Sequence, residues 1–185
     1  MKAARASSRV QLEVSSRKRE AEFLERVRAS RKLHRPWTGA PNTAEQFRAF
    51  LARARGDRFV SFFVCTRETN ELAGVINVME IVRGLFHGAY LGYYAFTPFA
   101  GQGLMREGVT LALDHAFGEL GLHRIEANVQ PKNERSRRLV SELGFRLEGF
   151  SPRYLKIGGR WRDHERWAIL AEEWPKARGR RRTLR

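Results

Sequence analysis

A short loop that contains two glycines places the tightest constraint on how this chain folds. The loop, Gly101-Gln102-Gly103-Leu104-Met105-Arg106, joins a strand-like run at residues 90–96 to a run with helical apolar spacing at residues 104–120. Such a connection presents backbone N–H groups at a helix N-terminus, where the helix dipole adds partial positive charge. The sequence therefore predicts either a phosphate-binding loop or a plain tight turn, and it matches neither a Walker motif nor G-x-G-x-x-G.

Strand-like runs outnumber helical runs along the rest of the chain. The predicted strands cover residues 10–14, 59–66, 71–82, 90–96, 123–130, 145–157 and 162–170. The predicted helices cover residues 15–33, 43–55, 104–120 and 134–143, with Ser15 or Ser16 capping the first and the Thr43-x-x-Gln46 capping box opening the second. Because several strands follow one another as hairpins, we expect an α/β (α+β) fold with a mixed sheet.

Length and composition favour a single globular domain. The 185 residues include 12 Phe, and 42% of them are hydrophobic, which suits one sizeable core. No run is long enough to span a membrane, and the N-terminus lacks the apolar region of a signal peptide. We therefore expect a cytoplasmic protein with no membrane anchor.

The only cysteine, Cys65, limits redox and metal chemistry. A single cysteine excludes an internal disulfide and any metal site built from several cysteines, so we expect no metal. Cys65 lies within Phe59-Val60-Ser61-Phe62-Phe63-Val64-Cys65, which is typical of a buried strand. A packed core thiol is therefore the preferred interpretation, because no neighbour in sequence would activate it as a nucleophile.

The net charge of +15 is concentrated at the two ends of the chain. Residues 1–35 hold eleven Lys or Arg and four Glu, and residues 175–185 hold six Lys or Arg and no acid. The remaining residues, 36–174, are nearly neutral at +2. We interpret residues 175–185 as a flexible basic tail that is either simply solvated or makes a weak contact with RNA or the ribosome.

Downstream of the glycine loop, three short motifs follow one another in a specific order. A strand at 123–130 precedes Asn133-x-x-Ser136, which opens a helix that ends in Leu143-Gly144-Phe145. This order resembles the GNAT (Gcn5-related) N-acetyltransferase superfamily. Further similarity points to the Rim-type branch, the ribosomal-protein-alanine N-acetyltransferases, and it lies in the segments Val82–His87, Tyr90–Tyr93, Tyr154-Leu155 and Gly159–His164. The resemblance is clear from residue 59 to residue 170.

The resemblance implies a fold and a cosubstrate. It implies a GNAT domain over residues 1–174, with about seven strands splayed between the fourth and fifth and about four flanking helices. Acetyl-CoA would lie in that gap, its pantetheine paired with the backbone of Tyr94, Ala95 and Phe96 and contacted by Asn133. The amides of residues 101–106 would hold the pyrophosphate, with added charge from Arg106. The family's Q/R-x-x-G-x-G/A loop falls on Ala100, Gly103 and Met105, so only the central glycine is kept.

The same resemblance proposes residues for the attack of an amine on the thioester. Ser136, near the sulfur, is the first choice of acid for the departing thiolate, and Tyr154 is the second. Glu126 is the best carboxylate for a base, acting directly or through water, although a surface salt bridge explains it equally well. Some relatives have a carboxylate near Tyr154 where this chain has Arg153. Asp163 and His164 are interpreted as holding the closing hairpin together.

The acceptor side is the least constrained part of the prediction. Trp37, Phe86 and His87 are candidates for an acceptor groove, although core or lid positions explain them as well. We expect the acceptor to be a protein N-terminus, as in the ribosomal proteins, and the enzyme to be a monomer or homodimer. Two alternatives stay open. One is a small amine acceptor such as an antibiotic, polyamine or amino acid; the other is a non-catalytic RNA-binding protein, although no RRM or KH motif is present.

Overall fold

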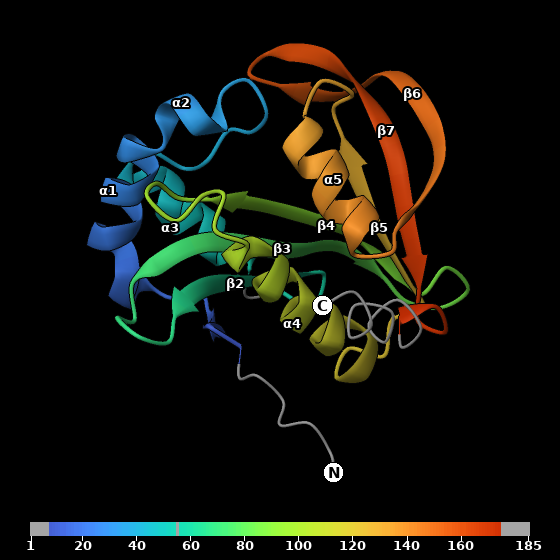
Figure 1. Cartoon of the computed structure of the whole chain (residues 1–185), viewed down its shortest axis with the longest axis horizontal. Helices are drawn as coiled ribbons and strands as arrows, with labels where there is room; N and C mark the ends of the chain where they lie inside the picture. The colour runs from blue at the N-terminus through green and yellow to red at the C-terminus, as the bar shows by residue number, and fades with distance from the viewer. Residues whose placement is uncertain (1–7, 55, 175–185) are drawn as a thin grey trace.

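The computed structural model describes residues 8–54 and 56–174, and within them seven strands form one sheet (Figure 1). The strands lie in the order β1-β2-β3-β4-β5-β7-β6. Their bounds are β1 Val10–Val14, β2 Phe59–Thr66, β3 Leu72–Val82, β4 Gly88–Ala95, β5 Arg124–Val129, β6 Arg146–Ile157 and β7 Arg160–Leu170. Neighbours are antiparallel except for β4 and β5, which run parallel. The expected mixed sheet is thus confirmed.

Helices cover both faces of this sheet (Figure 1). Their bounds are α1 Glu20–Ala29, α2 Arg31–His34, α3 Ala44–Arg53, α4 Leu104–Gly118 and α5 Glu134–Glu142. One hydrophobic core lies under α4 and α5 and includes Val109, Leu113 and Val140. A second, aromatic core lies under α1 and α3 and includes Phe23, Phe47 and Phe63. The basic tail predicted at residues 175–185 lies outside the described residues.

The two central strands separate part of the way along their length. β4 and β5 pair only at Gly88–Arg124, Ala89–Ile125 and Tyr90–Glu126. Beyond this point the residues of β4 and β5 have no partners in each other. The predicted splay between the fourth and fifth strands is therefore confirmed, and it leaves backbone groups available for a bound segment.

The first helix differs from its prediction. In place of one helix over residues 15–33, a 3₁₀ turn at Arg17–Arg19 precedes α1, and α2 follows as a single turn. Neither serine caps it, because the Ser15 hydroxyl contacts Ser61 Oγ at 2.8 Å and Ser16 makes no capping bond. The break falls at buried Ser30, whose Oγ accepts a hydrogen bond from the Thr97 N–H at 2.9 Å. A contact with the end of β4 thus overrides local helix propensity.

Other boundaries move by one or two residues. Thr43 caps α3 as predicted, since its Oγ1 accepts from the Gln46 N–H at 3.2 Å, although the Gln46 side chain accepts from Asn42. α3 ends at 53 and α4 at 118, because the turn after α4 closes on the His115 carbonyl. β4 covers 88–95 rather than 90–96, and β7 begins at 160 rather than 162. These shifts leave the predicted topology unchanged.

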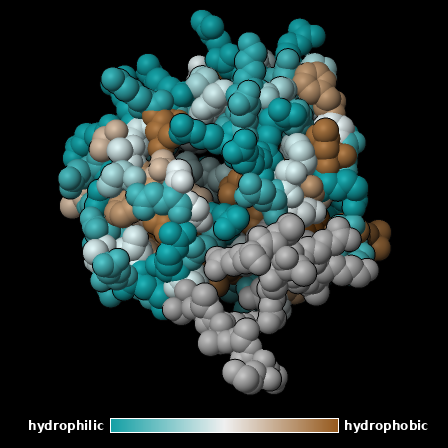
Figure 2. Space-filling view, viewed as in Figure 1, coloured by the Kyte–Doolittle hydropathy of each residue, from teal (hydrophilic) through white to brown (hydrophobic). Residues whose placement is uncertain are grey.

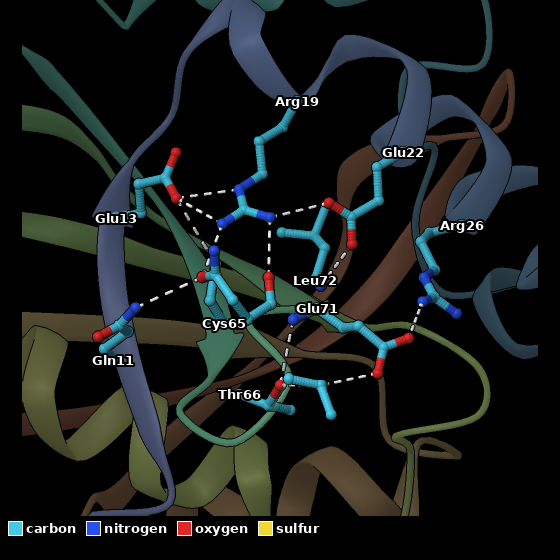
Figure 3. A network of polar contacts seen from close by, with 11 residues as sticks. Gln11, Glu13, Arg19, Glu22, Arg26, Cys65, Thr66, Glu71 and Leu72 are labelled. Atoms are coloured by element: carbon cyan, nitrogen blue, oxygen red, sulfur yellow. Dashed lines mark hydrogen bonds and ion pairs between the residues drawn. The ribbon is translucent and has the colours of Figure 1, made fainter.

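A closed network of charged groups fastens α1 to the edge of the sheet (Figure 3). At its centre the Arg19 guanidinium donates to Glu13 at 2.7 Å and to Glu22 at 2.9 Å. Glu22 in turn accepts from the Leu72 N–H at 2.7 Å. Cys65 lies beside this network, and burial raises the pKa of its thiol to about 11. The thiol therefore stays protonated at neutral pH, as expected for a packed core cysteine.

Helix α4 lies unusually close to the sheet because residue 108 is glycine. A Cβ atom at Gly108 would lie 2.9 Å from Val64 Cγ2 and 3.2 Å from Ile76 Cδ1. Any larger residue would therefore push α4 away from β2 and β3. The close packing fixes where the N-terminus of α4 lies relative to the end of β4. Within the described residues no helix is both long and apolar enough to cross a membrane.

Candidate active site

A cleft of about 1310 Å³ opens where β4 and β5 separate. Its lining comes from β4, β5, the loop before α4, the first turn of α5 and the segment around α2. Figure 1 shows α1 and α2 on one side of the molecule and α5 and β5 on the other, and Figure 2, drawn from the same direction, shows the surface hollowed between them. The cleft therefore joins the predicted phosphate loop to the predicted catalytic helix in one continuous space.

Ladder geometry determines which backbone groups of β4 face this cleft. The Phe96 N–H donates to the Ala73 carbonyl of β3 at 2.8 Å. Because hydrogen-bonded and non-bonded pairs alternate along an antiparallel ladder, Tyr94 also directs its backbone groups to β3, whereas Tyr93 and Ala95 face the gap. The prediction that Tyr94 and Phe96 pair with pantetheine through their backbone does not fit this geometry. Ala95 fits through its N–H group, because its carbonyl is hydrogen-bonded to His34, and Tyr93 is the second strand residue available.

His34 holds α2 against this part of β4. Its Nε2 contacts the Ala95 carbonyl at 2.8 Å, and its ring packs edge-on against Tyr94. Burial lowers the pKa of His34, so the neutral ring donates its Nε2 proton to that carbonyl. With the Ser30–Thr97 bond, this contact fastens the α1–α2 junction over one end of the cleft. Nothing in the local sequence pattern distinguishes His34 from an ordinary helical residue.

The glycine loop adopts the conformation that its sequence requires. Gly101 and Gly103 have φ values of 86° and 78°, which favour glycine, and Gly103 is the N-cap of α4. Among the described residues, the N–H groups of residues 102–105 have no hydrogen-bond acceptor. The Arg106 N–H instead donates to the Gly103 carbonyl at 3.1 Å, and the Arg106 side chain lies 3.6 Å from Glu142. The four amides of residues 102–105 are therefore available to an anion, whereas the Arg106 amide, also predicted to bind the pyrophosphate, is engaged within the protein.

Arg9, at the start of β1, braces this loop from outside. Its Nη2 donates to the Gln102 carbonyl at 2.9 Å, and its Nε donates to Glu107 Oε1 at 2.7 Å. Burial raises the pKa of Glu107, but its hydrogen bonds and ion pair with Arg9 outweigh burial and lower it. Because a trans peptide is planar, a Gln102 carbonyl directed at Arg9 turns the Gly103 N–H the opposite way. The sequence offered no sign of this long-range contact.

Positive side chains dominate the charge of the cleft. Six of its lining residues are Lys or Arg and three are Glu. The cations are Lys32, Arg35, Arg106, Lys132, Arg135 and Arg138. Together with the free amides of the loop, they suit a long, polyphosphorylated ligand such as coenzyme A. No cluster of His, Cys, Asp or Glu in the described segments could hold a metal ion.

The start of α5 places a hydroxyl pair in the cleft. Asn133 caps the helix, since its Oδ1 accepts from the Ser136 N–H at 3.2 Å. Ser136 Oγ lies 2.6 Å from the hydroxyl of Tyr93. Burial raises the pKa of Tyr93, so this phenol keeps its proton at neutral pH. Tyr93 was not predicted; the one available signal was its position two residues before Ala95 in the same strand.

A second pair of hydroxyl groups, this time from two tyrosines, lies at the other end of the cleft. The hydroxyl of Tyr90 is hydrogen-bonded to that of Tyr154, which raises the pKa of Tyr90 to about 12, with burial adding to the shift. Tyr154 also packs against the buried ring of His164. Asp163 accepts a hydrogen bond from the Arg153 N–H at 2.7 Å. This contact supports the interpretation that Asp163 holds the hairpin.

Glu126 lies beside the cleft but is not among its lining residues. Its Oε1 accepts from the Arg124 guanidinium at 2.8 Å, and Arg124 also pairs with Glu148. Its side chain is only 12% exposed, and it lies opposite Tyr90 across the last paired position of β4 and β5. The geometry therefore agrees with the salt-bridge interpretation, and the role of Glu126 as a base stays a prediction.

The three acceptor-side candidates lie in different places. Trp37 lines the cleft, and its carbonyl accepts from Gln130 at 3.3 Å. Phe86 and His87 belong to the turn before β4, at the end where β4 and β5 are still paired. The His87 carbonyl accepts from the His123 N–H there at 2.8 Å. The structure therefore brings Trp37 to the cleft and leaves Phe86 and His87 outside its lining.

The splayed strands β4 and β5, the glycine loop before α4 and the helix α5 capped by Asn133 together fit an acyl-CoA-dependent transferase. Comparison with known proteins agrees. The profile of the acetyltransferase (GNAT) domain matches residues 9–146. The chain therefore belongs to the GNAT acetyltransferase family and is an acetyl-CoA-dependent N-acetyltransferase.

Relatives with different acceptors resemble the chain. It is 41% identical over 111 residues to the [ribosomal protein uS5]-alanine N-acetyltransferase of Escherichia coli, covering 60% of this chain and 57% of that enzyme. It is 30% identical over 112 residues to the spermidine N(1)-acetyltransferase of Vibrio cholerae, covering 60% and 64%. The structure of RimJ from Mycobacterium smegmatis in complex with CoA-disulfide superimposes with a TM-score of 0.80 at 30% identity, covering 90% of this chain and 84% of that one.

Proposed function

We propose that this enzyme acetylates the N-terminal amine of a protein, and that a ribosomal protein is its substrate. The observation that carries the proposal is the charge of the cleft, which has six cations and three carboxylates in its lining. A polyamine carries several positive charges and needs carboxylates to pair with them. A protein N-terminus carries one ammonium, which must lose its proton before it reacts. The Lys and Arg side chains of the cleft therefore disfavour its binding far less than they disfavour that of a polyamine.

The carboxylates that do line the cleft are engaged or exposed. Glu142 lies 3.6 Å from Arg106, and Glu80 pairs with Arg58 and is 58% exposed. Glu134 is exposed in the first turn of α5, where the predicted cosubstrate site lies. No pair of free carboxylates is therefore arranged along the described cleft for a long cation. The similarity to the uS5-alanine enzyme supports the same acceptor class, although it covers little more than half of that enzyme.

The chemistry requires three events at the acceptor nitrogen and the thioester. The amine loses a proton and attacks the acetyl carbonyl carbon, the C–S bond then breaks, and the sulfur accepts a proton. Acetyl-CoA supplies the activated acetyl group. The gap between β4 and β5 would align the two reactants, and the gap-facing N–H of Tyr93 would be the donor for the oxyanion.

Ser136 is the proposed acid for the departing sulfur. The buried Tyr93 phenol keeps its proton and can donate it to Ser136 Oγ at 2.6 Å. The Ser136 hydroxyl proton is then free to be directed at the sulfur, with Asn133 fixing the helix turn that carries it. Tyr154 remains the second candidate, at the end of the cleft where its hydroxyl meets Tyr90.

For removal of the amine proton we retain Glu126, acting through water. Its absence from the cleft lining argues against direct contact, whereas Tyr90 and Tyr154 both line the cleft. The Arg124 ion pair competes with this role. Comparing Glu126→Gln with wild type across a pH series separates the two interpretations, since loss of a base lowers the high-pH plateau of kcat and loss of a salt bridge leaves it intact.

A ribosomal substrate would place the enzyme in the cytoplasm. It would also give the basic ends of the chain, residues 1–35 and 175–185, an anionic surface to approach; of these, residues 8–35 belong to the described structure. Acetylation does not require such contact, so deleting residues 175–185 should leave turnover on a short peptide unchanged.

The test is acetylation of defined acceptors. Purified enzyme and acetyl-CoA are mixed with short peptides that begin with Ala or Ser, with the same peptides already acetylated, and with spermidine. Release of CoA is measured and products are located by mass spectrometry. Acetylation of the free peptide N-terminus alone is the expected result. Efficient acetylation of spermidine with no reaction on any peptide would overturn the proposal in favour of a small-amine acceptor.

If peptides react, total ribosomal proteins provide the next acceptor. A single N-terminally acetylated product among them would identify the substrate. Acetylation spread over many N-termini, or confined to proteins outside the ribosome, would contradict the ribosomal part of the proposal and preserve the N-terminal part.

A further inference from the structure

Three polar side-chain atoms near the cleft are buried and have no hydrogen-bond partner among the described residues. They are Asn77 Oδ1 of β3, the Tyr94 hydroxyl of β4 and Asn128 Oδ1 of β5. Buried polar atoms are almost always satisfied in folded proteins, because leaving one unpaired is costly. A cluster of three therefore indicates a place where the missing partner is a ligand.

Strand register places the two asparagines in one row across the sheet. Asn77 pairs with Gly92 in the β3–β4 ladder. Two residues beyond the last pair, Tyr90–Glu126, Gly92 of β4 and Asn128 of β5 lie on opposite sides of the gap, and both line the cleft. The sequence neighbours of the two asparagines point into the core under α4 and α5; they are Ile76, Val78, Ala127 and Val129. Because side chains alternate along a strand, both asparagines point to the opposite face. Tyr94 packs against the aromatic core on that same face, one step along β4.

Because residue 92 is glycine, the methyl group of Met79 lies over the middle of this row. A Cβ atom there would meet the methyl group of Met79. Gly92 and Tyr94 line both the main cleft and a second cavity of about 430 Å³. That cavity reaches under α3, includes Asn77, and has no carboxylate in its lining. An extended chain entering the cleft would place its first side chain in the second cavity by displacing the flexible Met79 side chain, which lines both spaces.

We propose that Asn77, Asn128 and Tyr94 form the subsite that holds the first residue of the acceptor, with the two carboxamide oxygens accepting N–H groups and the tyrosine hydroxyl donating to the first peptide carbonyl. The subsite lies on the face of the sheet opposite α4 and α5, beside the gap in which β4 offers its backbone to the cosubstrate. This inference rests on the proposed function and specifies its acceptor site.

The polarity of the three groups matches a peptide N-terminus better than a polyamine. Two oxygens without donors call for N–H groups, which both ligand classes provide. Burial raises the pKa of Tyr94, so its hydroxyl is protonated and needs an acceptor. A peptide offers one in its first carbonyl oxygen, whereas a polyamine has no carbonyl. The lining of the 430 Å³ cavity includes Arg53 and no carboxylate, which argues against a cationic first side chain.

The experiment compares Asn77→Leu and Asn128→Leu with wild type on an Ala-initiated peptide. Because the carboxamide oxygens have no partner in the protein, leucine at either position should not lower the unfolding temperature. Each change should lower kcat/KM for the peptide about tenfold, the worth of one hydrogen bond to an amine. The Kd for acetyl-CoA, measured by calorimetry, should stay within twofold, and Tyr94→Phe should lower kcat/KM by a smaller factor.

Asn42→Ala is the matched control, because Asn42 is exposed and lies outside both cavities. Alanine at positions 77 and 128 repeats the test if leucine does not fit. Unchanged kcat/KM for the peptide in every variant would overturn the subsite and leave the proposed function standing. Loss of acetyl-CoA binding would also overturn it, by assigning the row to the cosubstrate. Failure of wild type on every peptide would overturn both inferences together.

Discussion

The two halves of the sheet treat their polar groups in opposite ways. At the β1–β3 side, Arg19, Glu13 and Glu22 satisfy one another in a closed network that fastens α1 (Figure 3). At the β4–β5 gap, backbone groups of β4 face open space, and Asn77 and Asn128 keep unpartnered oxygens. The polar groups of the first region pair with one another and stabilise the fold, whereas those of the second region are available to bind ligands.

This contrast predicts that substitutions in the two regions will separate stability from activity. Changes in the closed network should lower the free energy of unfolding with little effect on substrate binding. Changes at the gap should alter kinetic constants with little effect on stability. Four measurements follow, from the largest expected effect to the smallest.

Ser136→Ala tests the open region most strongly. Removing the proposed acid should lower kcat by about a hundredfold, the lower range for general acid catalysis, because the thiolate must then leave without a proton. The KM for acetyl-CoA should change little. Steady-state rates of CoA release measure both quantities. Ser141→Ala, on the exposed side of the same helix, is the control. A kcat close to wild type would exclude Ser136 as the acid and turn attention to Tyr154.

Arg19→Ala tests the closed region. The Arg19 side chain is 13% exposed, and its loss leaves two carboxylates facing each other without a cation. We expect the free energy of unfolding in urea to fall by about 2–3 kcal/mol. Arg17, 3.9 Å from Glu20 and 65% exposed, should lose less than about 0.5 kcal/mol on the same change. Weaker acetyl-CoA binding in folded Arg19→Ala protein would contradict the separation of the two regions.

Arg9→Ala tests a contact that links the two regions. Without the guanidinium, the Gln102 carbonyl is no longer held, and the loop amides lose their fixed direction. We expect the KM for acetyl-CoA to rise about tenfold, comparable to one charge-assisted hydrogen bond. S-acetylpantetheine, which has no pyrophosphate, should show no such change. An equal rise for both substrates would mean that Arg9 only supports the fold. Arg58→Ala, remote from the loop and 67% exposed, is the control.

Acid sensitivity should give the smallest effect. Burial lowers the pKa of both His34 and His164, so the folded protein resists protonating them. In the unfolded chain they titrate near about 6.5. Because the unfolded state then binds more protons, the free energy of unfolding should fall as the pH drops from about 7 to 5. His34→Gln, which can still donate to Ala95, should reduce this slope in urea titrations. An unchanged slope would argue against a neutral His34.

Local patterns predicted the mixed sheet and the helix that begins after Asn133, whereas the splay of the central strands was predicted from the family resemblance. Gly101 and Gly103 have positive φ values, so the residue type itself indicates the turn there. The direction of the β4 backbone groups could not be read this way, because it depends on the bond between Phe96 and Ala73. The assignment of Tyr94 and Phe96 to the pantetheine failed for that reason.

Residues that act through tertiary contacts were missed in the same way. Arg9 meets Gln102 across 93 positions of sequence, and His34 meets Ala95 across 61. The proposed acceptor role of Asn77 and Asn128 can be recognised only from the strand register, which places them on the same face of the sheet. Phe86 and His87 were placed near the acceptor because they adjoin a central strand, but they adjoin its paired end.

Through Gly108, the proposed affinity of the loop amides for acetyl-CoA depends on packing in the hydrophobic core. Val64 and Ile76 set the height at which α4 rests on the sheet, and α4 carries the loop amides at its first turn. A methyl group added or removed beneath the helix would tilt those amides by a small angle without touching any ligand. Sequence drift at such core positions is thus a route by which enzymes of this architecture can retune their dependence on the cellular acetyl-CoA supply while every ligand-contacting residue stays the same.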